Sequence, residues 1–85
     1  MRILLVDDHT VVRRGLKQIL ADEFKQAAFG EAGSAQQALD LVGKEHWDIV
    51  VLDITMPGRS GLDVMREIRN SRPRLPVLVL DRKSV

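Results

Sequence analysis

Four short apolar runs limit the fold of this 85-residue chain more than any other feature of the sequence. The runs at residues 3–6, 48–53 and 76–80 have continuous apolar cores, which is typical of strands buried on both faces of a parallel sheet. Residues 27–32 form a weaker candidate, with small side chains and one aromatic. Stretches with helical spacing separate the runs, and parallel strands need crossovers of this length. The pattern therefore predicts one α/β domain in the order β-α-β-α-β-α-β.

Each predicted helix begins at a residue type that commonly caps helices. Thr10, Ser34 and Ser60 occupy these positions, and Gln37 completes a capping box with Ser34. Gly43 lies where the second helix is expected to end. The apolar residues at helical spacing, which should face the sheet, are Val11, Val12, Leu16, Ile19, Leu20 and Phe24, then Ala35, Ala38, Leu39, Leu41 and Val42, and finally Leu62, Met65 and Ile68.

Charge and composition exclude several classes of function. The formal net charge is +1 with acids and bases interspersed, so the chain lacks the clustered basic face that nucleic-acid binding needs. Arg66 and Arg69 are expected on a solvated helix face. The absence of cysteine excludes disulfides and thiolate metal sites. The apolar run at residues 3–6 is too short for a signal-peptide core or a membrane span, so a cytoplasmic location without membrane contact is expected.

Aspartates follow two of the predicted strands at the point where each strand ends. Asp7 and Asp8 follow the first strand, and Asp53 ends the third. In a flavodoxin-like parallel sheet of order 2-1-3-4, these strands are neighbours about 4.8 Å apart. Three carboxylates there would repel one another unless a cation lay between them, and oxygen ligands suit Mg²⁺. We therefore expect a magnesium site at which Asp53 accepts a phosphoryl group, although each aspartate taken singly could be a helix cap or loop carboxylate.

Other residues capable of chemistry have simpler structural interpretations. His9 and His46 are too isolated in sequence to form a metal pair, and each is expected at the surface or as a cap. Trp47 precedes the third strand and is expected to pack against the core. Neither a glycine-rich phosphate loop nor a paired-histidine zinc motif is present.

Several segments taken together resemble the receiver domain of bacterial two-component response regulators. The resemblance extends from residue 2 to about residue 80 and implies a CheY-like fold. Its type is most similar to the NarL/FixJ regulators. The segments that carry the resemblance are residues 3–9, 12–16, 30–32, 48–58 and 61–62.

The resemblance also implies roles for individual residues. In receiver domains the second aspartate of the acidic pair, the phosphoacceptor aspartate and a backbone carbonyl two residues beyond it bind Mg²⁺. These positions are Asp8, Asp53 and the carbonyl of Thr55. Asp7 would support the metal shell, and a phosphohistidine on a sensor histidine kinase would donate the phosphoryl group. The chain would then be a phosphoacceptor module of a signalling system, not an enzyme.

The sequence departs from the family pattern after residue 80. Receivers carry Ser or Thr at the end of the fourth strand, where this chain has Asp81, whose charge would repel an aspartyl phosphate. The helix, the lysine-ended strand and the helix that normally follow are not found in the polar tail 81–85, nor is a DNA-binding domain. We therefore expect a C-terminally truncated, partial receiver domain over residues 1–80, with impaired switching.

A receiver of this form would have an apolar surface to cover. Its fourth strand would be an unprotected edge, and part of Val12, Leu16 or Ile19 on the first helix would be exposed. This favours a homodimer or higher oligomer formed through that strand and helix. Two alternatives remain open: a non-catalytic dimerisation or interaction module with a vestigial acidic pocket, or a fragment without a role of its own.

Overall fold

The computed structural model describes residues 1–54 and 61–80. The predictions made for Thr55, Ser60 and Asp81 therefore lie outside the described residues. So do those made for the turn at residues 56–58 and for the tail.

Four strands and three helices alternate along the chain, as predicted. In chain order they are β1 (Arg2–Val6), α1 (Thr10–Glu23), β2 (Ala28–Ala32), α2 (Ala35–Lys44), β3 (Ile49–Asp53), α3 (Gly61–Ser71) and β4 (Val77–Leu80). The strands form one sheet in the order β2-β1-β3-β4, and every neighbouring pair is parallel. The flavodoxin-like order predicted from the sequence is confirmed.

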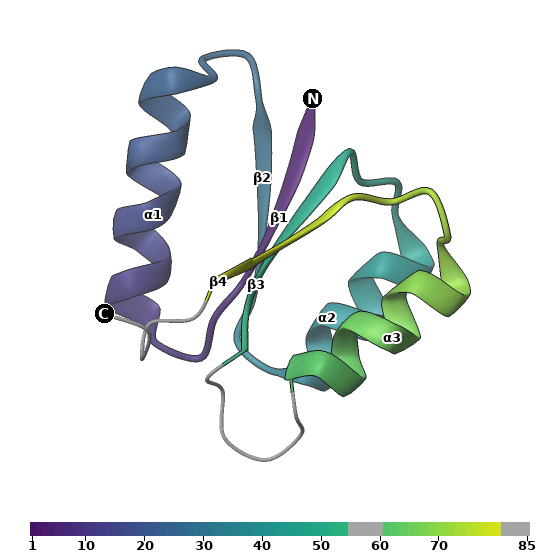
Figure 1. Cartoon of the computed structure of the whole chain (residues 1–85). Helices are drawn as coiled ribbons and strands as arrows, with labels where there is room; N and C mark the ends of the chain where they lie inside the picture. Colours follow the sequence, from purple (N-terminus) through teal and green to yellow (C-terminus); the bar gives the residue numbers. More distant parts are fainter. Residues whose placement is uncertain (55–60, 81–85) are drawn as a thin grey trace.

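The helices cover both faces of the sheet, which explains why the strands are apolar without alternation. Figure 1 shows α1 on one face and α2 and α3 together on the other. Alternate side chains of the central strands point to opposite faces. The side chains facing α2 and α3 include Leu4, Val6, Val50 and Leu52, and those facing α1 are Ile3, Leu5 and Val51.

The helix ends agree with the sequence predictions in part. The Ser34 hydroxyl accepts a hydrogen bond from the backbone N–H of Gln37, which confirms the cap of α2. The prediction that Thr10 caps α1 was wrong, because the helix already begins at Thr10. His9 occupies the N-cap position and makes no side-chain cap hydrogen bond. Gly43 lies near the end of α2, as expected, and the helix ends one residue later at Lys44.

Two predicted apolar faces are less buried than their spacing suggested. Leu62 is 48% exposed, because α3 begins at Gly61 and instead buries Gly61, Val64 and Ile68 against the sheet. On α1, Val11 is 85% exposed and none of the helix residues is fully buried. A single helix covers this face of the described sheet, so α1 has the sheet as its packing surface and no neighbouring helix.

Trp47 belongs to the core on the face of the sheet that α2 and α3 cover. Its indole packs against Gly30 of β2 and donates a hydrogen bond to the Leu41 carbonyl at 2.9 Å. This confirms Trp47 as a packing residue. Nearby, the backbone N–H of Arg2 donates to the Asp48 carboxylate, which lowers the pKa of Asp48.

Candidate metal centre

The two central strands deliver Asp7 and Asp53 to the same edge of the sheet. Val6 of β1 pairs in register with Leu52 of β3, so the residues that follow this pair emerge side by side. Asp53 is 1% exposed and Asp7 is 4% exposed. The backbone N–H of Asp7 donates to the Ala32 carbonyl at 3.0 Å and continues the pairing of β1 with β2. Two acidic side chains are thus buried at one end of an apolar sheet.

A tight turn after β1 brings two further side chains to this edge. The carboxylate of Asp7 accepts a hydrogen bond from the backbone N–H of His9 at 2.8 Å, the side-chain-to-backbone bond of an Asx turn. The turn leads directly into α1. It places the imidazole Nδ1 of His9 2.9 Å from Oδ1 of Asp8 and 3.5 Å from Oδ1 of Asp7.

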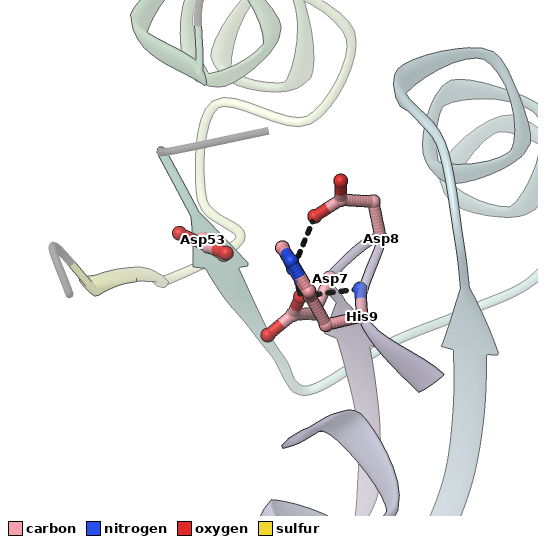
Figure 2. Close-up of side chains that lie close together, drawn as sticks. All are labelled: Asp7, Asp8, His9 and Asp53. Atoms are coloured by element: carbon pink, nitrogen blue, oxygen red, sulfur yellow. Dashed lines mark hydrogen bonds and ion pairs between the residues drawn. The ribbon is translucent and has the colours of Figure 1, made fainter. Parts of the chain in front are cut away.

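One ligand atom from each of Asp7, Asp8, His9 and Asp53 can be chosen so that all lie within 4.8 Å of one another. Figure 2 shows Asp8 and His9 turned towards each other beside Asp7, with Asp53 contributed by β3. Carboxylate groups this close and this buried repel one another, and a bound cation relieves that repulsion. The donor set fits a divalent cation, because hard cations take carboxylate oxygens and imidazole adds a nitrogen donor.

Arg13 supports this edge from the first turn of α1. Its Nη1 donates to the Asp7 carbonyl at 2.6 Å, and its Nε donates to Oε1 of Glu31 at 2.9 Å. The hydrogen bond from Arg13 and the positive charge of Lys17, whose Nζ lies 3.5 Å from Oε2 of Glu31, lower the pKa of Glu31. The guanidinium of Arg13 thus links the backbone at Asp7 to Glu31 on the neighbouring strand β2.

The structure brings Asp7, Asp8 and Asp53 together, while Thr55 lies outside the described residues. His9 is exposed at the N-cap position of α1 and lies far from His46, as expected, but its contact with the acidic pair was not predicted, because it depends on the turn that folds the imidazole back. The Asp-x-His spacing of Asp7 and His9, which permits an Asx turn, was the available signal. His46 is exposed at the opposite end of the sheet, 3.6 Å from Asp48.

An open parallel sheet with acidic residues at the ends of its two central strands, where the strand order reverses, defines a class of α/β proteins that bind ligands at this edge. Residues 3–84 match the family model of the response regulator receiver domain. The chain belongs to this family.

The curated relatives agree in type with the NarL/FixJ resemblance. The DNA-binding transcriptional activator DevR/DosR of Mycobacterium tuberculosis is 38% identical over 80 residues, which is 94% of this chain and 37% of that protein. The nitrate/nitrite response regulator NarP of Escherichia coli is 33% identical over 79 residues, which is 93% of this chain and 37% of that protein. The chain therefore spans just over a third of the length of these relatives.

Solved structures share the fold closely. TrrA of Thermotoga maritima, in complex with Mg²⁺ and beryllium fluoride, superimposes with a TM-score of 0.87 at 35% identity over 99% of this chain and 76% of that chain. The complex of the histidine kinase ThkA with TrrA gives a TM-score of 0.88 at 37% identity over 99% of this chain and 71% of that chain. Receiver domains bind Mg²⁺ through an acidic pocket, accept phosphoryl groups from sensor histidine kinases and act as signalling modules.

The helices in the described part of the chain are all too short or too polar to cross a membrane.

Proposed function

We propose that residues 1–80 of this chain form a phosphoacceptor module that binds Mg²⁺ and receives a phosphoryl group on Asp53. The observation that carries the proposal is the convergence of Asp7, Asp8 and Asp53 at the ends of two paired strands. Asp53 is the deepest of the three and ends β3, so its position is set by the sheet and not by a loop. A nucleophile held in this way needs little reorganisation before it reacts.

Asp8 and Asp53, with the backbone carbonyl of Thr55, would be the protein ligands of the ion, and Asp7 would support the shell. The Asp7 carboxylate already accepts the N–H of His9 and so is oriented by the turn. When bound, Mg²⁺ supplies positive charge against the oxygens of the transferring phosphoryl group. A carboxylate oxygen of Asp53 forms the new bond to phosphorus, the bond from phosphorus to the donor nitrogen breaks, and the nitrogen keeps that electron pair.

The donor in this proposal is a phosphohistidine of a sensor histidine kinase. The solved complex of ThkA with TrrA supports this choice, because that regulator shares the fold of this chain at 37% identity. Asp81 follows β4 directly in the sequence, and Leu80 pairs with Asp53 in the sheet. A carboxylate next in the chain would repel the phosphoryl group, so we propose that the response to phosphorylation is weakened.

Phosphorylation of the chain by acetyl phosphate and Mg²⁺, followed by intact-protein mass spectrometry, tests the proposal. We expect one phosphoryl adduct in the wild type and none in Asp53→Asn. Asp48→Asn is the matched control, because Asp48 is an exposed aspartate beside the opposite end of β3 and should leave the adduct unchanged. Equal adduct formation by Asp53→Asn, or none by the wild type, contradicts the proposal.

A second candidate function is dimerisation or interaction without phosphoryl transfer. The observation that favours it is the apolar edge at β4, the last strand of the described sheet, where Leu78 is 52% exposed. Val12 and Ile19 of α1 are exposed as well. We propose that a second copy of the chain covers this surface through edge-strand pairing. A monomeric mass by light scattering at micromolar concentration contradicts it.

A further inference from the structure

The imidazole of His9 lies against the acidic cluster and does not cap its helix. His9 is the N-cap residue of α1, yet its side chain makes no cap hydrogen bond. Its Nδ1 lies 2.9 Å from Oδ1 of Asp8 instead, on the side of the turn that faces the acidic cluster (Figure 2). A ring nitrogen is therefore directed at the carboxylates that would hold the ion.

The separation of these two atoms is compatible with binding to one ion. Neighbouring ligands of a six-coordinate ion with bonds of about 2.1 Å lie about 3 Å apart. The Nδ1 atom of His9 and the Oδ1 atom of Asp8, which are 2.9 Å apart, have this spacing. The His9 side chain is 57% exposed, so its ring can adjust to an ion without disturbing the core.

Nitrogen ligation changes which ions a site favours. Mg²⁺ prefers oxygen ligands, whereas imidazole suits Ni²⁺, Zn²⁺ and other first-row transition ions. We propose that His9 supplies a nitrogen ligand to the cation held by Asp8 and Asp53, and that it shifts the preference of the site from Mg²⁺ towards transition-metal ions. This inference rests on the cation site of the proposed function and adds a determinant of its metal specificity.

Calorimetric titration of the tag-free chain with Ni²⁺ and with Mg²⁺ tests the role of His9. In His9→Ala we expect Ni²⁺ affinity to fall about tenfold or more. Loss of a residue that only supports a metal ligand already lowers metal affinity by about tenfold, and loss of a ligand should cost at least as much. Mg²⁺ affinity should stay within about twofold, because its oxygen ligands remain. His46→Ala is the control, since His46 is the other histidine of the chain and lies at the opposite end of the sheet.

A spectroscopic measurement on the wild type makes the test independent of any variant. With Mn²⁺ bound, pulsed electron paramagnetic resonance should detect a directly coordinated nitrogen, and the signal should be absent in His9→Ala and present in His46→Ala. Equal losses of Ni²⁺ and Mg²⁺ affinity in His9→Ala, or no nitrogen signal in the wild type, overturn the inference. Mg²⁺ binding without a nitrogen signal removes this inference alone, whereas failure of the wild type to bind any ion removes the proposed site as well.

Discussion

The guanidinium of Arg13 donates a hydrogen bond from Nε to Oε1 of Glu31 at 2.9 Å, and both side chains are largely shielded from solvent. This pair connects the first turn of α1 to β2. Because the same guanidinium also donates to the Asp7 carbonyl, the pair holds the backbone of the acidic turn in place. Stability and site geometry should therefore change together when it is broken.

Arg13→Ala should lower the free energy of unfolding by about 2 kcal/mol, the size expected for hydrogen bonds to a charged group that is partly buried. It should also weaken Mg²⁺ binding, because the turn that carries Asp8 loses the hydrogen bond from Arg13 to the Asp7 carbonyl. Urea unfolding and calorimetry measure the two effects. Arg14→Ala is the control at an exposed neighbouring position and should change stability by less than about 0.5 kcal/mol. Equal effects of the two substitutions would show that the Arg13 contacts contribute nothing.

The contribution of Glu31 should depend on pH in a defined direction. The pKa of Glu31 is lowered from its ordinary value of 4.5, so its stabilising effect is present above that value and is lost as the pH falls through the lower folded-state pKa. The stability difference between the wild type and Glu31→Gln should stay constant above the ordinary value of 4.5 and shrink as the pH falls below it. Unfolding curves above and below this value measure it. A difference that grows on acidification contradicts the assignment.

Alanine substitutions at two glycines should distinguish a loss of stability from a change in the geometry around Asp53. A Cβ added to Gly61 would clash with Ile54, the residue after Asp53, and would lie 2.7 Å from the Ile54 Cβ. A Cβ added to Gly30 would clash with the Trp47 ring. Each substitution by alanine should cost about 1–3 kcal/mol through overpacking. Only Gly61→Ala should also reduce phosphorylation of Asp53, because the clash shifts the end of β3. Normal adduct formation by Gly61→Ala would contradict this coupling.

The apolar edge strand should respond to a charge. Leu78→Lys should reduce self-association, since lysine on an edge strand disfavours pairing with another chain. Stability should change by less than about 0.5 kcal/mol, because the side chain is 52% exposed. Leu62→Lys, at a similarly exposed position on α3, is the matched control. Sedimentation velocity at several concentrations distinguishes the two, and equal behaviour of both variants would exclude β4 as the contact.

The sheet could be predicted from sequence because its strands are buried on both faces. Continuous runs such as those of β1 and β3 permit few other arrangements, and the aspartates that end them report which edge binds ligands. The helix faces were less predictable. The spacing of Leu62 with Met65 and Ile68 fits a buried stripe, but the burial of Leu62 depends on where α3 begins relative to the sheet.

The aspartates of the candidate site could be predicted from the sequence, but the residues that contact and position them could not. Strand ends place Asp7 and Asp53 through backbone geometry alone, and Asp8 directly follows Asp7 in the sequence. His9 and Arg13 depend on a turn and on long side chains reaching across elements, and sequence spacing does not specify either.

The clustering of the three aspartates at the sheet edge is tested most directly by a Mg²⁺ titration. The measurement follows the backbone amide resonances of the wild type and of Asp8→Asn by nuclear magnetic resonance. The account predicts saturable shifts in the wild type, centred on Asp8, Asp53 and their strand neighbours, and greatly weakened binding in Asp8→Asn. The absence of saturable shifts at these residues, or equal binding by the variant, would contradict it.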